Sequence, residues 1–302
     1  MPRGIGYSLV MVALFAALPF VYGNDTLLFN MMMYLALAQG INMLYGFTGY
    51  LPFGYVGFFG AGAYGASIAI LLLHVPAAVA LLIGGACSVL VGLLLAPLLR
   101  LSGAYFSIAN LAASEAIYYV VSNPHLTPIT QGPYGVNLAA AFNAHASYAA
   151  MVAILALSLG AVVYLRNSNT GLALQAIRED PISAGMAGIN VVRERILVWL
   201  LSALLAGLVG GAFAWHVSVF YPETVFDLNI SVFAIVFVLF GGAATLIGPM
   251  VGTLLLYSVY NWIGISQPEY FQLIFGIAIV GLTLFLPNGL TSLLRRVNID
   301  AP

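Results

Sequence analysis

The chain has 302 residues, of which 63% are hydrophobic and only 6% are charged, with a formal net charge of −1. Soluble globular domains carry about 25% charged residues, so this composition excludes a water-soluble fold and places the chain in a membrane. All eight basic residues are Arg, and the absence of Lys excludes a P-loop ATP-binding site, whose Lys must reach the outer phosphates. The single cysteine, Cys87, excludes an intrachain disulfide and a cysteine metal cluster.

The predicted fold class is all-α: a polytopic membrane helical bundle that forms one domain over residues 1–302. About 20 helical residues cross the hydrocarbon core of a bilayer, and the apolar runs supply ten such segments. They lie near 5–22, 27–45, 54–73, 76–99, 103–122, 148–165, 196–219, 230–247, 249–264 and 271–287. The first run follows a single Arg, as a secretion signal does, but it lacks a small-x-small cleavage site. We therefore interpret it as an uncleaved first span.

The distribution of charge predicts the orientation of these spans. With the N-terminus inside, the inner connections hold every basic residue of the chain, namely Arg3, Arg100, Arg166, Arg178, Arg193, Arg195, Arg295 and Arg296. The outer connections carry only the acidic residues Asp25, Glu223, Asp227 and Glu269. Basic residues favour the cytoplasmic side of a membrane, so both termini are predicted to be cytoplasmic and the number of spans to be even.

Two segments rich in Gly and Pro predict interrupted helices. These are "LYGFTGYLPFGYVG" (44–57) and "LFGGAATLIGPMVG" (239–252), which match at five of fourteen positions in one register. Interruptions in corresponding halves of a chain are typical of a transport pathway, because unwound backbone is stable only against protein or water. Plain turns are the alternative, and an abundance of Gly and Leu could produce the match by chance.

Small residues recur at four-residue spacing in three places, at 57, 61 and 65, at 203, 207 and 211, and at 248 and 252. In lipid, such a ridge lets two helix backbones approach closely. These ridges predict tight packing between helices and do not by themselves indicate a function.

Glu115 is the one charged residue well inside a predicted span. A charged carboxylate in the membrane interior costs a few kcal/mol unless it is protonated or paired. We therefore expect a neutral or hydrogen-bonded carboxyl that faces the bundle, in a structural role or in a pathway, gating or proton-coupling role. The next connection, 123–147, is long and uncharged, and it is predicted to face an external partner or to cap the outer mouth.

The connection 166–195 is the largest on the cytoplasmic side, and six charged residues lie between positions 178 and 195. Asn169 or Thr170 can cap a first short helix, and Asp180 can cap a second with Pro181 at its first position. Gly188 can end that helix in a left-handed conformation. Two capped helices exceed what a topology signal needs, so we interpret the connection as a docking element for a cytoplasmic partner. A solvated loop that only sets topology is the alternative.

Several segments together resemble the permease family of bacterial ATP-binding cassette importers for branched-chain amino acids. They are "LYGFTGYLPFGYVGFFGAGAYGAS", "LSGAYFSIANLAASEAI", "LTPITQGPYGV", "GLALQAIREDPISAGMAGINVVRERI", "LFGGAATLIGPMVGTLL" and "LFLPNGLTSLL". They occur in family order from about residue 30 to 295, and the fourth is the most specific.

The resemblance implies a subunit without catalysis of its own, in the bacterial inner membrane. Its implied partners are a homologous second permease, two cytoplasmic ATP-binding subunits that hold the ATP and Mg²⁺, and a periplasmic solute-binding protein, with no nucleic acid. The implied contacts with the ATP-binding subunits are Gly171, Ala176, Arg178, Glu179, Asp180, Pro181, Ala184 and Gly188. Candidate residues of the translocation path are Asn42, Thr48, Tyr50, Tyr55, Asn110 and Glu115.

The chain departs from the family pattern near the path. Where the family shows Gln, Ser and His after "GFTG", this sequence has Tyr50, Pro52 and Tyr55, and Asn110 replaces a common Thr. These differences leave the solute open among branched-chain amino acids, urea, short amides, and aromatic or dicarboxylic acids.

Two other function classes remain as alternatives. A self-sufficient secondary transporter would need a site for a coupling ion, for which Glu115 alone is thin support. An intramembrane enzyme or an assembly factor would need paired catalytic residues, and the spans contain none. The four His residues have no spacing typical of metal ligands, so no metal site is predicted.

Overall fold

The computed structural model describes residues 3–20 and 22–266, and beyond these only residues 273, 276–277 and 280–281. Its α-helices are α1 (Arg3–Ala17), α2 (Asp25–Ile41), α3 (Val56–Leu73), α4 (Ala77–Leu95), α5 (Gly103–Val121), α6 (Thr127–Thr130), α7 (Ala144–Asn167), α8 (Asn169–Glu179), α9 (Pro181–Met186), α10 (Val191–Val217), α11 (Pro222–Val225), α12 (Leu228–Gly241) and α13 (Ile247–Ser266). Two short strands, β1 (Val136–Asn137) and β2 (Val219–Phe220), complete the secondary structure together with several single turns of 3-10 helix.

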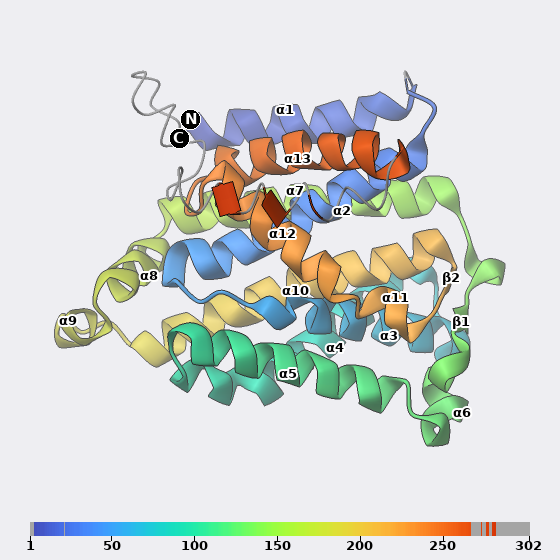
Figure 1. The fold of residues 1–302 in the computed structure, drawn as a ribbon, viewed down its shortest axis with the longest axis horizontal. Coiled ribbons are helices and arrows are strands. Elements are labelled where there is room, and N and C mark those ends of the chain that lie inside the picture. The colour runs from blue at the N-terminus through green and yellow to red at the C-terminus, as the bar shows by residue number, and fades with distance from the viewer. Residues whose placement is uncertain (1–2, 21, 267–272, 274–275, 278–279, 282–302) are drawn as a thin grey trace.

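The long helices lie side by side, and the two largest connections lie at opposite ends of them (Figure 1). Helices α8 and α9 project at one end, whereas α6 and the paired strands lie at the other. The sequence predicted that the connections 166–195 and 123–147 face opposite sides of a membrane. Their positions at opposite ends of the helices agree with this topology, which stays a prediction.

Six helical stretches of the described residues are long and apolar enough to cross a membrane, by length and composition. They are Asp25–Gly46, Phe53–Leu73, Ala77–Arg100, Ala144–Asn167, Val191–Val217 and Pro222–Gly241. Helix α1 is apolar but shorter, and α5 and α13 are not among the six. The predicted span 271–287 lies outside the described residues except at five positions. The helical class is therefore confirmed, whereas the count of ten spans is not shown.

Two predicted spans have different ends in the structure. The span predicted at 27–45 continues through a π-helical turn, Asn42–Gly46, so that α2 and this turn form one stretch. The span predicted at 230–247 ends early, because α12 stops at Gly241 and residues 242–246 form a turn before α13. Both differences fall at the segments that the sequence marked as interrupted.

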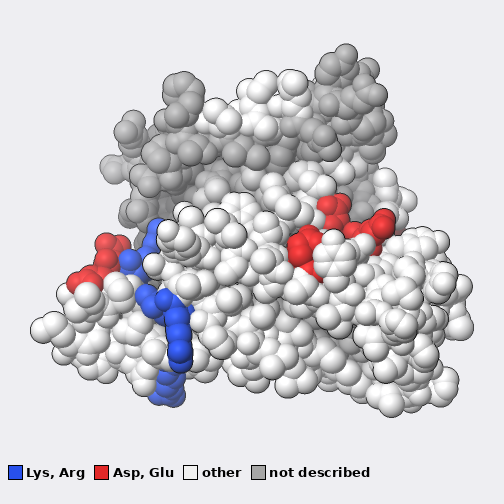
Figure 2. All heavy atoms as spheres, turned by 60° about the horizontal axis from the view of Figure 1, so that its bottom comes forward, with Lys and Arg blue, Asp and Glu red and all other residues white. Residues whose placement is uncertain are grey.

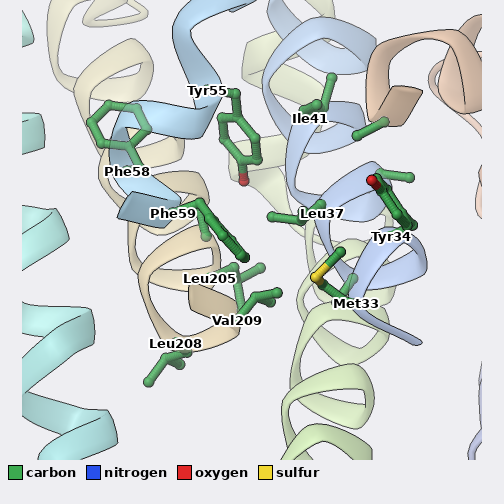
Figure 3. Close-up of a cluster of buried hydrophobic side chains, with 14 of the residues drawn as sticks. Met33, Tyr34, Leu37, Ile41, Tyr55, Phe58, Phe59, Leu205, Leu208 and Val209 are labelled. Atoms are coloured by element: carbon green, nitrogen blue, oxygen red, sulfur yellow. The ribbon is translucent and has the colours of Figure 1, made fainter. Parts of the chain in front are cut away.

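The core lies between α2, α3 and α10 (Figure 3). Apolar side chains from the three helices meet there, including Leu37 and Ile41 of α2, Phe58 and Phe59 of α3, and Val209 of α10, and all of them are buried. In water a helix with buried residues on every side would be exceptional, but a membrane helix can be apolar all round. Burial on α2 extends around the helix from Leu35 to Ile41, so α2 is the central helix of the bundle.

Helices α3, α4 and α10 approach one another so closely that only glycine fits at several crossing points. A Cβ atom on Gly62 would lie 2.2 Å from the carbonyl oxygen of Gly207, and one on Gly84 would lie 2.5 Å from the carbonyl oxygen of Gly62. A Cβ atom on Gly210 would lie 1.9 Å from the carbonyl oxygen of Phe59. The close helix packing predicted from the small residues, which included position 207, is confirmed here.

The outer connection 123–147 is ordered by contacts with the turn that follows α10. Strand β1 pairs antiparallel with β2, with Val136 opposite Phe220, and the N–H of Leu138 donates to the carbonyl of Ser218. The indole of Trp215 donates to the carbonyl of Ala141. The sequence analysis did not predict this strand pair, because two-residue strands have no periodicity that a pattern can reveal.

Candidate functional site

The helical backbone is interrupted at two places, and the second interruption packs against the π-helical turn that precedes the first. The first break, residues 49–52, lies between the π-helical turn after α2 and the 3-10 turn Phe53–Tyr55 that precedes α3. The second break, residues 242–246, lies between α12 and α13. Helical structure therefore stops within both segments that the sequence marked. The first of them joins two stretches that can each cross a membrane, so the alternative of a plain turn stays open. The origin of the two segments as an internal repeat stays a prediction.

Asn42, which is fully buried, joins α2 to the second break. Its Nδ2 donates to the carbonyl of Thr245 at 2.8 Å, and its Oδ1 accepts the N–H of Ala244 at 2.8 Å. One turn earlier, Gln39 Nε2 donates to the carbonyl of Leu246 at 3.0 Å. Unwound backbone inside a membrane protein needs such partners because no water is available there. The two amide side chains supply them.

The backbones at this junction leave no room for a side chain at Gly46. A Cβ atom at Gly46 would lie 2.6 Å from both the backbone nitrogen of Ala244 and Oδ1 of Asn42. Ala244 itself has a φ of +63°, a left-handed conformation that costs a non-glycine residue about 1–2 kcal/mol. The hydrogen bond from its N–H to Asn42 helps to hold this conformation.

Three other path candidates, in or beside the first break, have side chains that point into the interior of the protein. Thr48 Oγ1 donates to the carbonyl of Leu44, and the Tyr50 hydroxyl donates to the carbonyl of Leu99 at 3.0 Å. The Tyr55 hydroxyl donates to the carbonyl of Ser202 on α10 at 2.8 Å and lies between α2 and α10 (Figure 3). All three side chains are buried. In this chain they hold the first break against its neighbours.

Helix α5 contacts the first break with one face. Asn110 Oδ1 accepts the N–H of Gly54 at 2.8 Å, and Ser107 Oγ donates to the carbonyl of Leu51 at 2.8 Å. The Nδ2 atom of Asn110 is buried and has no hydrogen-bond partner in the described part of the chain. Beside these contacts, an open groove of about 490 Å³ lies between residues 49–53 and the first half of α5. Gly49 and Leu51 of the first break are part of its lining.

Glu115 does not face the bundle of this chain, which corrects the prediction. The buried positions of α5 include Phe106, Asn110 and Ser114, which recur every four residues. Glu115 follows Ser114, so it is turned about 100° away from that face and its side chain is exposed. It makes no hydrogen bond to the residues that the structure describes. The nearby Tyr118 lies within electrostatic range of both Glu115 and Glu223.

Glu115 and Asn110 lie on different faces of α5, so we expect their substitution to have different effects on the free energy of unfolding. We expect Glu115→Gln to change the free energy of unfolding by less than about 0.5 kcal/mol, because exposed side chains away from special features contribute little. Asn110→Leu, in contrast, leaves the buried N–H of Gly54 without an acceptor and is expected to cost about 1–3 kcal/mol. Thermal unfolding of the detergent-purified chain, followed by tryptophan fluorescence, measures both. Equal destabilisation by the two variants would contradict the orientation of α5.

Helices α8 and α9 form a hairpin, residues 168–188, that projects from the bundle between α7 and α10 (Figure 1). Its first helix is capped by Ser168, which accepts the N–H of Gly171, rather than by Asn169 or Thr170 as predicted. Its second helix is capped by Asp180, with Pro181 at the first position, as predicted. Gly188 adopts a φ of +87° just beyond α9, also as predicted.

Hydrogen bonds from the Ser183 hydroxyl and from the N–H of Ile182 lower the pKa of the Asp180 carboxyl. Because the ionised cap accepts these bonds, its contribution to stability is present above the ordinary Asp pKa. That contribution is lost only as the pH falls through the lowered pKa. The corner between the two helices is therefore intact at neutral pH.

Some of the residues predicted to contact ATP-binding subunits are exposed on the hairpin, and others are buried. Ala176, Glu179, Asp180, Pro181 and Gly188 are exposed, whereas Gly171 and Ala184 are buried against the bundle. Gly171 is in close contact with α7, because a Cβ atom there would lie 1.7 Å from the carbonyl oxygen of Leu165. Arg178 is exposed in part, but its Nη1 donates to the carbonyl of Gly46 at the end of the π-helical turn.

The sequence analysis missed two features of this end of the molecule. Ile182 and Met186 of α9 are exposed by 75% and 86% and lie four residues apart, so they share one outward face. A helix of six residues is too short for a pattern of apolar positions to be recognised. The second feature is Arg195 of α10, whose guanidinium lies 5.0 Å from the centre of the Tyr50 ring.

Basic side chains on the visible face gather at the hairpin end, where acidic side chains lie beside them, and a second acidic group without basic neighbours lies nearer to the other end (Figure 2). This separation agrees with the asymmetry of Arg and acidic residues in the sequence. Among the described residues, no three His, Cys, Asp or Glu side chains come together as a metal site requires.

Comparisons with known proteins add the following similarities. A family model described as "Branched-chain amino acid transport system / permease component" matches residues 24–283. The high-affinity branched-chain amino acid transport system permease protein LivM of Escherichia coli (strain K12) is 26% identical over 323 residues, which cover 96% of this chain and 75% of that protein. The probable branched-chain amino acid transport permease protein LivH of Methanocaldococcus jannaschii is 30% identical over 46% of this chain and 45% of that protein. The fructose import permease protein FrcC of Rhizobium meliloti is 28% identical over 46% of this chain and 40% of that protein. No solved structure matches the chain.

Proposed function

The chain belongs to the family of permease components of branched-chain amino acid transport systems, and we propose that it is the membrane-spanning permease subunit of an ATP-binding cassette importer. It is a permease component, and six helical stretches among its described residues can cross a bilayer, so it is a multi-pass membrane protein. In this proposal it forms half of a translocation pathway, and a homologous second permease forms the other half.

The projecting hairpin of α8 and α9 is the observation that carries this function. Exposed apolar side chains on a projecting element are typical of protein interaction sites, and Ile182 and Met186 are of this kind. The chain has no Lys for a P-loop of its own, so we propose that two partner subunits bind the ATP and Mg²⁺. The hairpin would be the surface on which one of these subunits docks.

The distribution of Arg supports a topology with the hairpin in the cytoplasm. With ten spans and both termini in the cytoplasm, all eight Arg fall in the inner connections. We propose this topology in a bacterial inner membrane, with the connection 123–147 facing a periplasmic solute-binding protein. Glu115, exposed on α5, would then face the second permease or the pathway rather than lipid, where a charge is costly.

We propose a branched-chain amino acid or a related small organic solute as the substrate. The name of the Escherichia coli relative, which aligns with 96% of this chain, supports this class. A relative that aligns with less than half of the chain is a fructose permease by name, and Tyr50, Pro52 and Tyr55 depart from the family pattern. Identifying the solute held by the associated binding protein would decide among these classes.

The docking role of the hairpin predicts a specific loss of partner binding. We expect Ile182→Glu to lower recovery of the co-expressed ATP-binding subunits with the membrane-extracted permease at least about tenfold, because a buried charge replaces an apolar interface side chain. Uptake of radiolabelled solute should fall in parallel.

Phe142→Glu provides the matched control. Phe142 is an exposed apolar residue in the connection 123–147, at the end of the molecule away from the hairpin. This variant should therefore leave recovery of the ATP-binding subunits unchanged. Undiminished recovery in Ile182→Glu would contradict docking on the hairpin. Uptake by the permease without any ATP-binding subunit would instead support a secondary transporter.

A further inference from the structure

The hairpin is hydrogen-bonded to the π-helical turn just before the first break, and it touches the start of the break at Gly49. Arg178 Nη1 on α8 donates to the carbonyl of Gly46, across 132 residues of sequence. Gly46 is the last residue of the π-helical turn, and three residues later Gly49 takes a φ of +78° as the helix ends. The Cγ atom of Arg178 lies 3.8 Å from the position of a Cβ atom on Gly49. The side chain of Arg178 therefore lies along the start of the break.

A second arginine contacts the same break from α10. The guanidinium of Arg195 lies 5.0 Å from the centre of the Tyr50 ring, a geometry in which a cation is attracted to the ring face. Its Nε atom is buried and has no hydrogen-bond partner among the described residues. Tyr50 is fixed in turn by its hydroxyl, which donates to Leu99, and by an edge-to-face contact with Phe106 at 4.7 Å. The ring thus connects Arg195 to α5.

Arg178 lies on the hairpin, and Arg195 lies near the start of α10, the helix that follows it. The residues that they contact, Gly46 and Tyr50, are four positions apart in the sequence. Helix α8 is an 11-residue element with a capped start, so a displacement of the hairpin carries Arg178 with it. The carbonyl of Gly46 is one of the last in an interrupted helix, and such carbonyls lack a complete set of partners within the helix. Arg178 provides a partner that moves with the hairpin.

We propose that Arg178 and Arg195 are positioning residues that transmit movement of the hairpin to the first break. This inference rests on the proposed function, because the movement is the one that ATP-binding subunits would impose. It differs from the role that the family resemblance implied for Arg178, namely a contact with an ATP-binding subunit. Arg178 acts within its own chain, and docking belongs to the outward face of α9.

Reconstitution of the complete importer into proteoliposomes, with its binding protein and solute, tests the role of Arg178. Two quantities are measured: recovery of the ATP-binding subunits with the permease, and moles of solute taken up per mole of ATP hydrolysed. We expect Arg178→Ala to keep recovery within twofold of the unmodified protein and to lower uptake per ATP at least tenfold. Arg178→Lys, which retains one donor for the carbonyl, should recover part of the loss.

Arg193→Ala is the matched control. Arg193 lies in the same connection, and its side chain is exposed and makes no hydrogen bond or ion pair within the described part of the chain. Both measured quantities should be unchanged in this variant. If recovery in Arg178→Ala falls as far as uptake does, Arg178 is a docking contact and the proposal is overturned. Unchanged uptake per ATP would overturn it as well.

Tyr50 provides a second arm that leaves Arg178 intact. Tyr50→Phe keeps the ring beneath Arg195 but loses the hydroxyl, whereas Tyr50→Leu loses both. We expect Tyr50→Leu to lower uptake per ATP at least fivefold more than Tyr50→Phe. Equal losses would remove Arg195 from the proposal. Failure of the proposed function is distinguishable from these outcomes, because it would appear as full recovery of ATP-binding subunits in Ile182→Glu.

Discussion

Asn42→Leu is expected to lower the free energy of unfolding by about 2–6 kcal/mol. The side chain of Asn42 satisfies the N–H of Ala244 and the carbonyl of Thr245, each at 2.8 Å, and it is fully buried. Leucine has a similar volume but no polar atom, so both backbone groups lose their partner. Each buried group left unsatisfied costs about 1–3 kcal/mol, and in a membrane no water replaces the lost bond.

Asn167→Leu is the matched control for this prediction. Asn167 is exposed, and its Nδ2 donates to the carbonyl of Val163 within its own helix. Loss of this local bond should change stability by less than about 0.5 kcal/mol. Thermal unfolding of the purified chain in detergent compares the two variants. A melting temperature in Asn42→Leu equal to that of the control would contradict the view that Asn42 holds the second break.

Local features of the site could be predicted from the sequence because they depend on neighbouring residues. Asp180 and Pro181 start α9 and Gly188 follows its end, since caps and left-handed positions have strong residue preferences. The two interrupted segments were recognised for the same reason, because a cluster that combines Gly with Pro favours a turn. The capping error at α8 is small: Ser168 lies one residue before the predicted positions.

Contacts between distant residues could not be predicted from one sequence. The acceptor for Arg178 is a backbone carbonyl 132 residues away, and any residue type offers such a group. The orientation of Glu115 depends on which face of α5 packs against the first break, and α5 has polar residues on both faces. The predicted path role of Asn42 stays a prediction. Only the fold shows that its partners are the backbone groups of the second break.

Gly210→Ala is expected to lower the free energy of unfolding by more than about 3 kcal/mol. The new Cβ atom would lie 1.9 Å from the carbonyl oxygen of Phe59 and 3.1 Å from the backbone nitrogen of Ala63. Overpacking costs about 1–3 kcal/mol where side chains can rearrange. Here the neighbours are backbone atoms of α3, so α3 and α10 must separate. Their separation would also disturb the crossing of Gly62 with Gly207.

The same substitution elsewhere is expected to have the opposite sign, which makes Gly160→Ala the control. Gly160 is exposed in the middle of α7, and a Cβ atom there would meet no atom within 4 Å. Alanine is more favourable than glycine in a helix by about 0.8–1.0 kcal/mol, so this variant should be slightly more stable than the unmodified chain. Thermal unfolding in detergent measures both variants. A stability loss at Gly160 as large as that at Gly210 would contradict the view that the close approach of the α3 and α10 backbones determines the loss at Gly210.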